Sequence, residues 1–243
     1  MRVSRKSGFT VLGVLFGFSA LFGCRGPAGA TGPMGPSGPG TGSPVYFLNQ
    51  DFDGTGYNPS SQFSVYAANG GNIIMGLTGS NFVSAPTSLS VTSSTGGVGI
   101  ASGLYTSPGA FPYLGGYDYY LDTYVNFETS SGAKTEVMLI LNGNAVADFG
   151  YLAPTTVYTY ENGASVTLSS GLGAGYFHHV ILYWSHATGL SSLTLDGNLI
   201  VQNVSGIRAE PTGAPTTGAG LYFPNSTSSG NYVLLDNFSV YHY

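Results

Sequence analysis

The chain has 243 residues, of which 42% are hydrophobic, 14% aromatic and 7% charged, against roughly 25% charged in an ordinary soluble domain. This composition excludes a disordered chain, which needs high charge and few aromatic residues, and the single cysteine excludes a disulfide scaffold. Six basic residues against eleven acidic ones leave no cationic surface for phosphates, which excludes a nucleic-acid partner.

Residues 1–23 are predicted to be a signal peptide. The first positions carry three cations, Arg2, Arg5 and Lys6. The uncharged stretch 9–23 is too short for a membrane span of about 20 residues but typical of a signal sequence. It ends in Leu21-Phe22-Gly23-Cys24, which resembles the lipobox of bacterial lipoproteins, although Phe22 stands where a small residue is usual. The resemblance implies that Cys24 becomes the diacylated N-terminus and anchors the protein to a membrane.

Two alternatives remain open for this N-terminus. Cleavage after Ala20 would release a secreted protein, and Gly8-Phe9-Thr10 is similar to a prepilin cleavage site, although Gly13 stands where pilins carry Glu. We expect an exported protein, held at the bacterial cell envelope or outer surface by its lipid. Without residues 1–23 the chain has three basic and eleven acidic residues, a net side-chain charge of −8. That charge disfavours anionic partners and leaves neutral or cationic ligands open.

Residues 24–44 combine the anchor cysteine with a collagen-like spacer. Five Gly-X-Y triplets run over residues 26–40, and Thr41 stands where the next glycine would be. A triple helix needs glycine at every third position, because only glycine fits at its axis. Five triplets with no adjoining coiled coil favour a single stiff spacer of about 45 Å, at roughly 3.1 Å per residue. We therefore expect a monomer, with a collagen-like trimer as the alternative.

Residues 45–243 are predicted to form one all-β domain, an antiparallel β-sandwich. Apolar and polar residues alternate along Tyr119–Phe127, as in a half-buried strand. The turns Asp196-Gly197 and Asn142-Gly143 each separate two strand-like segments, which is the strongest short hairpin signal. Val180–Trp184 is continuously apolar, as expected in the middle of a sandwich.

The order of these segments resembles the concanavalin A-like (laminin-G-like) jelly roll. The resemblance rests on four late segments, Gly175–Trp184, Ala187–Leu190, Leu193–Gly197 and Tyr232–Val240. They are similar to the "WHHV…W…ATG…L…LDG" series of that family and to its last strand, which often carries an aspartate. The family contains lectins, glycan-binding modules, adhesive domains and glycanases. The resemblance therefore supports a fold more strongly than a function.

Asp236 is the most informative acidic residue. It shares strand parity with Leu234 and Phe238, which predicts a carboxylate on the core-facing side, where it is costly unless it is paired or bound. Asp51 and Asp53 lie near the other end of the domain, and first and last strands are often neighbours in jelly rolls. A structural Ca²⁺ site formed by Asp51, Asp53 and Asp236 is one interpretation. The other is that Asp236 accepts backbone N–H bonds or faces solvent at a bulge.

Catalytic and zinc-binding patterns are missing from the sequence. His178 and His179 are adjacent, so in a strand they point to opposite faces and cannot bind one ion together. The four glutamates are scattered, at Glu128, Glu136, Glu161 and Glu210. Glu136 lies on a plausible strand, but the Glu-x-Asp-x-x-Glu run of the family's glycanases is missing. We therefore predict that the protein is not an enzyme.

Aromatic loops are the remaining candidates for a ligand surface. One Gly/Pro-rich segment contains Tyr105, Phe111, Tyr113 and Tyr117, and a second contains Tyr151, Tyr158 and Tyr160. Tyrosine combines an apolar face with a hydroxyl, which suits it to stacking on sugar rings or to protein contacts. The predicted ligand-binding residues are Tyr113, Tyr117, Tyr158 and Tyr160.

These observations predict a surface-displayed, non-catalytic binding module for a glycan or extracellular matrix material. The first alternative is a structural envelope lipoprotein that contacts a surface protein and binds no sugar. A glycan hydrolase is the weaker alternative.

Overall fold

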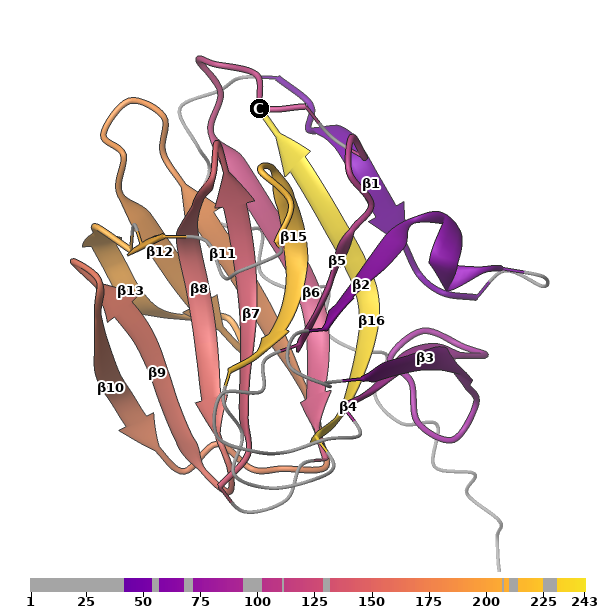
Figure 1. The fold of residues 1–243 in the computed structure, drawn as a ribbon. Coiled ribbons are helices and arrows are strands. Elements are labelled where there is room, and N and C mark those ends of the chain that lie inside the picture. The colour runs from indigo at the N-terminus through magenta and orange to yellow at the C-terminus, as the bar shows by residue number, and fades with distance from the viewer. Residues whose placement is uncertain are drawn as a thin grey trace, which may run out of the picture. The chain divides into compact units, whose positions relative to one another are not determined.

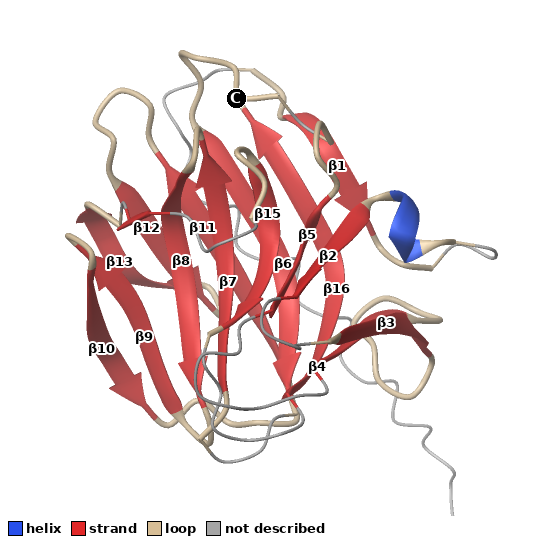
Figure 2. Cartoon of the chain, viewed as in Figure 1, coloured by secondary structure: helices blue, strands red, loops and turns tan. Residues whose placement is uncertain are grey.

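A computed structural model of the chain describes residues 42–53, 57–67, 72–93, 102–110, 112–128, 132–206, 208–209, 214–224 and 231–243. The predicted signal peptide, Cys24 and the collagen-like triplets lie outside these ranges, as do Phe111 and Glu210. Strands dominate the described chain, and its single helical element is the short turn η1, Pro59–Ser61 (Figure 2). None of the described helical structure is long and apolar enough to cross a membrane.

The strands form two antiparallel sheets that face each other (Figure 1). Sheet A has the order β13 (Asn198–Val204), β12 (Ser191–Leu195), β11 (Phe177–Trp184), β6 (Tyr119–Phe127), β16 (Asn231–His242), β4 (Ser88–Ser93) and β3 (Ile73–Thr78), and β1 (Val45–Gln50) also pairs with β16. Sheet B has the order β10 (Ala164–Ser170), β9 (Thr156–Glu161), β8 (Asn144–Leu152), β7 (Lys134–Leu141), β15 (Gly218–Phe223), β5 (Ser102–Thr106) and β2 (Phe63–Ala67), and β14 (Arg208–Ala209) pairs with β8.

The predicted hairpins are confirmed. Asp196 and Gly197 connect β12 to β13 with φ of 50° and 79°, and Asn142 and Gly143 connect β7 to β8 with φ of 50° and 77°. Two consecutive residues with positive φ give the twist that matches paired strands, and asparagine, aspartate and glycine adopt it at least cost. These turns set the register of both hairpins.

The core lies between the two sheets. Leu121 of β6 and Leu182 of β11 come from sheet A, while Val137 and Leu139 of β7 come from sheet B, and all four belong to one buried apolar cluster. In β7 the residues that alternate with Val137 and Leu139, such as Glu136 and Met138, therefore face away from the core, because side chains alternate along a strand. This alternation places the side chain of Glu136 on the outer face of sheet B.

The first and last strands are neighbours, as the jelly-roll resemblance implied, since Val45 pairs with His242. Strand β16 also contains a β-bulge at Asn237, whose φ is 48°. Leu235 before the bulge and Phe238 after it both lie in the core. The bulge thus reverses the parity of the strand, because it adds one residue to one side of the pairing.

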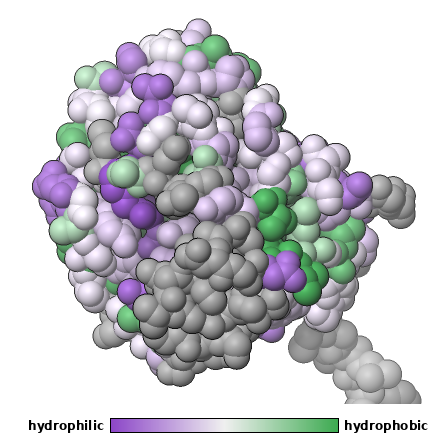
Figure 3. Space-filling view, viewed as in Figure 1, coloured by the Kyte–Doolittle hydropathy of each residue, from purple (hydrophilic) through white to green (hydrophobic). Residues whose placement is uncertain are grey.

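Apolar side chains also gather on the surface over β2 and β3 (Figure 3). Val65 of β2 and Ile74 and Leu77 of β3 are exposed. Each of these strands ends the order of its sheet. One side of the described domain therefore combines edge strands with an apolar surface.

Candidate functional site

The outer face of sheet B carries a row of six residues that lie opposite one another on neighbouring strands. From β2 to β9 the row is Tyr66, Gly103, Tyr222, Glu136, Gly150 and Tyr158. Large side chains thus alternate with glycines along parts of the row. A second row beside it contains Ser64, Tyr105, Gly220, Met138 and Asp148.

The glycines make room for two tyrosine rings. A Cβ atom at Gly150 would lie 2.3 Å from the ring of Tyr158, and one at Gly103 would lie 2.4 Å from the ring of Tyr105. The two rings therefore lie over the backbone of these glycines, in space that any other residue would fill. This packing holds both tyrosines in the face of the sheet rather than in loops.

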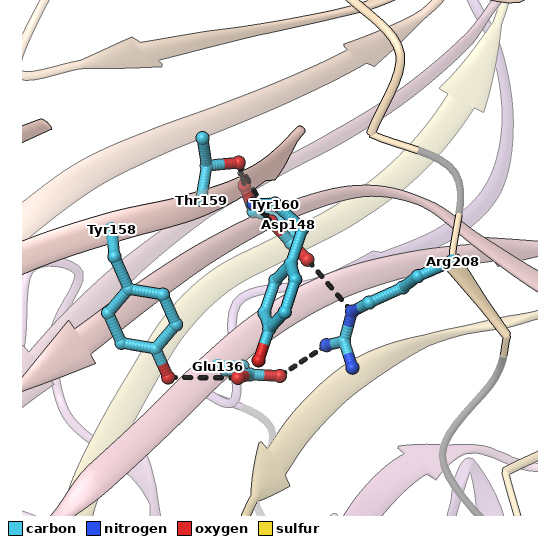
Figure 4. A network of polar contacts seen from close by, with 6 residues as sticks. All are labelled: Glu136, Asp148, Tyr158, Thr159, Tyr160 and Arg208. Carbon is cyan, nitrogen blue, oxygen red and sulfur yellow. Dashed lines mark hydrogen bonds and ion pairs between the residues drawn. The ribbon is translucent and has the colours of Figure 1, made fainter. Parts of the chain in front are cut away.

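A polar network links four strands of sheet B, β7, β8, β9 and β14 (Figure 4). Tyr158 Oη donates to Glu136 Oε1 at 2.8 Å, and the Arg208 guanidinium donates to Glu136 Oε2. Arg208 Nε also donates to Asp148 Oδ2 at 3.2 Å. The other carboxylate oxygen of Asp148 accepts from Thr159 Oγ1 at 2.8 Å and from Tyr160 N at 3.0 Å. Each carboxylate oxygen in the network therefore has a donor.

The network is buried and unbalanced in charge. Glu136 is fully buried and Asp148 is 3% exposed. Burial raises the pKa of both carboxyl groups, and the positive charge of Arg208 opposes that rise. The Arg208 guanidinium also lies over the ring of Tyr160, 4.1 Å from its centroid. Arg208 thus forms ion pairs with both buried carboxylates, and these ion pairs hold β14 against the outer face of sheet B.

Two adjoining pockets open beside this network. The Tyr66 pocket, about 220 Å³ in volume, is lined by Ser64, Val65, Tyr66, Tyr105, Thr106, Pro108, Ala214 and Pro215. The Tyr113 pocket, about 420 Å³, is lined by Pro108, Gly109, Pro112, Tyr113, Ala214, Pro215, Thr216 and Thr217. Pro108, Ala214 and Pro215 belong to both linings, so the two pockets form one groove. All the described lining residues are uncharged.

The four predicted ligand-binding tyrosines fall into two separate groups. Tyr113 is 37% exposed and lines the groove, while Tyr117 is 41% exposed and packs against His242, with ring centroids 4.3 Å apart. Tyr158 and Tyr160 lie in strand β9, so their assignment to a loop was wrong, and Tyr158 is buried in the network. Tyr151, from the same predicted loop, lies in the core.

Tyr66, Asp148 and Arg208 belong to no motif in the sequence, and Glu136 was expected on a strand without a catalytic role. One signal was present in the sequence. Glu136 interrupts the run Lys134–Leu141, which is otherwise apolar after its first two residues. A lone carboxylate in such a strand needs a partner, because burying an unpaired charge is costly. The partner itself, 72 residues away in the chain, had no local signature.

Asp236 lies on the outer face of sheet A, where it pairs with Tyr124 of β6, and the prediction that it faces the core was wrong. The reason is the bulge at Asn237. The Oδ2 atom of Asp236 accepts from the backbone N–H groups of Val83 and Ser84 at 2.7 and 3.0 Å. Its Oδ1 accepts from Ser84 Oγ at 3.0 Å and from Asn237 N at 2.8 Å. These four donors match the four acceptor positions of a carboxylate.

The other two predicted calcium ligands are also engaged in hydrogen bonds. Asp51 is exposed, and its Oδ1 accepts from Asp53 N at 3.1 Å. Asp53 Oδ1 accepts from Thr87 N at 3.2 Å. Among the described residues, no group of three or more His, Cys, Asp or Glu side chains is placed to hold a metal ion. A calcium ion at Asp236 would have to displace one of its present donors, and the calcium site stays a prediction.

The two adjacent histidines have separate partners, as their opposite orientations predicted. His178 Nδ1 lies 2.8 Å from Asp196 Oδ2, and its Nε2 lies 2.9 Å from the carbonyl oxygen of Gly173. His179 Nε2 lies 2.7 Å from Asp122 Oδ1. Both rings therefore contribute to structure on sheet A and at the β12–β13 turn.

Together, the two antiparallel sheets, their order and the pairing of the first and last strands define an antiparallel jelly-roll β-sandwich. No known protein-family profile matches the chain, and no curated protein matches it in sequence. The likeness to solved structures is therefore a likeness of fold.

Three solved structures illustrate it. The cellulose-induced protein Cip1 is 18% identical, with a TM-score of 0.53 over 79% of this chain and 96% of its own. A carbohydrate esterase from the Shiga toxin-encoding bacteriophage phi24B is 10% identical, with a TM-score of 0.58 over 82% of this chain and 99% of its own. A sialidase is 10% identical, with a TM-score of 0.52 over 80% of this chain and 18% of its own.

Proposed function

We propose that the protein is a non-catalytic binding module that holds a neutral polysaccharide chain in the groove of sheet B. The observation that carries this proposal is the lining of the groove. Three tyrosines and three prolines offer apolar faces, and Ser64 and the threonines offer hydroxyls, without a charged side chain among the described lining residues. Sugar rings need this combination, because they have apolar C–H faces and polar hydroxyl rims.

The carboxylates of this face support binding rather than hydrolysis. A glycosidase needs a pair of carboxyl groups that can reach the scissile bond and a water. Glu136 and Asp148 are buried, and their oxygens accept hydrogen bonds from Arg208, Tyr158, Thr159 and the backbone of Tyr160. Their role in this proposal is to hold the groove in shape.

The proposal extends to how the module is displayed. A lipid on Cys24 would hold the chain at the bacterial envelope, and the Gly-X-Y triplets would act as a spacer between the lipid and the groove. The net charge of −8 without the signal peptide is compatible with neutral glycans and with solubility near a membrane.

The full chain, purified in detergent, is titrated with cellohexaose, xylohexaose and mannohexaose by isothermal calorimetry. We expect at least one of these neutral hexasaccharides to bind, and Tyr113→Ala to weaken binding by about tenfold, which corresponds to about 1.4 kcal/mol. Tyr176→Ala serves as the control, because Tyr176 is 70% exposed and outside the groove lining. If the wild-type chain binds none of the three, the proposed function is overturned in favour of a structural envelope protein.

A further inference from the structure

The hydroxyl group of Tyr105 is buried and has no hydrogen-bond partner among the described residues. The side chain is only 1% exposed. A buried polar group without a partner is rare in folded proteins and destabilises the fold, because it gives up its bonds to water. A hydroxyl left in this condition needs an explanation, and one explanation is a ligand that supplies the missing bond.

The position of this hydroxyl is set by glycine. Tyr105 Oη lies 2.6 Å from where a Cβ atom at Gly103 would be. Gly103 is itself flanked in the row by Tyr66 and Tyr222, its partners on β2 and β15. The hydroxyl thus lies over the backbone of β5, between two strands whose facing residues are also tyrosines. The hydroxyl is therefore buried against the sheet and does not lie at the exposed edge of the outer face.

Tyr105 also lines the Tyr66 pocket. Other hydroxyls in that lining already have partners, since Thr106 Oγ1 accepts from Ala219 N at 3.2 Å and Ser64 Oγ lies 3.3 Å from Ser107 Oγ. The pocket, with its volume of about 220 Å³, has room for more than one water molecule. A buried hydroxyl of this lining, that of Tyr105, therefore has hydrogen-bonding capacity that is unused within the described residues.

We propose that the Tyr66 pocket is the specificity subsite of the groove, in which Tyr105 Oη hydrogen-bonds to a hydroxyl of one neutral sugar unit. The inference rests on the proposed function and names the subsite that distinguishes one sugar from another. A phenol both donates and accepts, as a sugar hydroxyl does, so the pair can form in either direction. Tyr66 supplies the apolar wall of the same pocket.

The charges nearby select against acidic sugars. Glu136 and Asp148 lie in the rows that contain Tyr222 and Tyr105, and Arg208 is already bound to both carboxylates. The network therefore has an excess of one negative charge when both carboxyls are ionised. A uronate placed in the pocket would meet this charge, and none of the described lining residues is a cation that could pair with it. The ligand class is a neutral sugar chain.

Tyr105→Phe tests the inference, because it removes only the hydroxyl and keeps the ring over Gly103. The full chain and the variant are titrated with the hexasaccharide of the three that binds the wild type most tightly, and their thermal unfolding is compared. We expect the affinity to fall about tenfold while the unfolding temperature stays the same or rises, because the unpartnered group is gone. Tyr176→Phe, which removes an exposed hydroxyl, should change neither value.

The outcomes separate the two levels of the proposal. If the wild type binds and Tyr105→Phe binds equally well, the subsite is overturned while the binding function stands. If Tyr105→Phe lowers the unfolding temperature by several degrees, the hydroxyl has a partner inside the folded protein and the inference is overturned. If the wild type binds none of the hexasaccharides, the binding function is overturned, and the subsite with it.

Discussion

Tyr158 donates a 2.8 Å hydrogen bond to Glu136 across strand β8, which lies between their two strands. The bond is possible because Gly150, the residue of β8 that lies between them, has no side chain to block the ring. Gly150 therefore allows the ring of Tyr158 to pack over β8 and, in the same position, to donate a hydrogen bond to the buried carboxylate of Glu136. The stability of the outer face of sheet B depends on this coupling.

Gly150→Ala should destabilise the protein by about 1–3 kcal/mol, the usual cost of forcing extra atoms into a packed site. The new Cβ would lie 2.3 Å from the ring of Tyr158, so the ring must move and its bond to Glu136 must lengthen. Urea unfolding measures the change. Gly115→Ala is the matched control, because a Cβ there meets nothing within 4 Å. Equal stability of the two variants would contradict the packing described for Tyr158.

Arg208→Leu should destabilise the protein by about 3–5 kcal/mol near neutral pH. The substitution leaves Glu136 and Asp148 buried together without their cation, and removing one partner of a buried ion pair is expensive. Chemical denaturation at pH 7 measures the loss. The double variant Arg208→Leu, Glu136→Gln should recover part of it, because one of the two buried charges is then removed.

The pH dependence of Arg208→Leu has a definite sign. Burial raises the pKa of Glu136 and Asp148 above the unfolded values, and Arg208 opposes that rise in the wild type. A carboxyl with a raised folded pKa binds its proton more tightly in the folded state, so its burial costs least at low pH and most above the folded pKa. The deficit of the variant relative to the wild type should therefore shrink as the pH falls toward 4. A deficit that is constant with pH would show that the loss is one of packing alone.

The strands and turns of this fold were predictable, whereas the site was predictable only in part. Alternation along Tyr119–Phe127 and the turns at Asn142 and Asp196 are local signals, and the structure has strands and turns at those positions. The prediction that Asp236 faces the core failed because one bulge residue, Asn237, shifts the alternation of side chains along β16. Residues before the bulge therefore face the opposite side from the one that the residues after it predict. No local rule places a bulge within a strand-like sequence.

The polar network of Glu136, Asp148 and Arg208 could not be predicted from the sequence for a different reason. Arg208 comes from a two-residue strand, and its acidic partners lie 72 and 60 residues earlier in the chain. Pro154 and Gly163 lie near Tyr158 and favour a loop there, although both are in turns that flank strand β9. The polar network therefore could not be predicted, because its partners lie far apart in the chain and because turns flank the strand that carries Tyr158.

The pair of His178 and Asp196 should stabilise the fold most between about pH 4 and pH 6.5, the unfolded pKa values of the two groups. Burial lowers the pKa of His178, but hydrogen bonds to Asp196 and Gly173 outweigh it and the net pKa is raised. The stability from a raised histidine pKa is present below the unfolded value and is lost as the pH rises through the folded value. Burial raises the pKa of Asp196, but the bonds from His178 and His179 outweigh it, so its contribution is lost as the pH falls through the lowered value.

The measurement for this pair is the unfolding temperature as a function of pH for the wild type and His178→Gln. The difference between the two curves should be largest between pH 4 and pH 6.5 and smaller on either side. His186→Gln provides the control, since His186 is an exposed histidine beyond the end of the same strand. A difference that is flat across this range would argue against a charged pair.

Calcium removal tests the predicted metal site at Asp51, Asp53 and Asp236. Because four donors already occupy the carboxylate of Asp236, we expect excess EDTA to leave the unfolding temperature unchanged. Asp236→Ala should still destabilise the protein, by about 1–3 kcal/mol, since the N–H groups of Val83 and Ser84 lose their acceptor. Stoichiometric calcium by elemental analysis, with a fall in unfolding temperature on chelation, would instead establish the calcium site.

The Gly-X-Y triplets should leave the protein monomeric. Five triplets with no adjoining oligomerisation element form a spacer in this proposal, so residues 24–243 with Cys24→Ser and residues 45–243 should have the same oligomeric state by light scattering. The serine variant removes the lipid, which would otherwise aggregate the sample and obscure its mass. A trimer that appears only when residues 26–40 are present would reverse the interpretation, because it would give the triplets the role of a triple helix. In that case three grooves would be displayed together, and binding to a long polysaccharide would gain from multivalency.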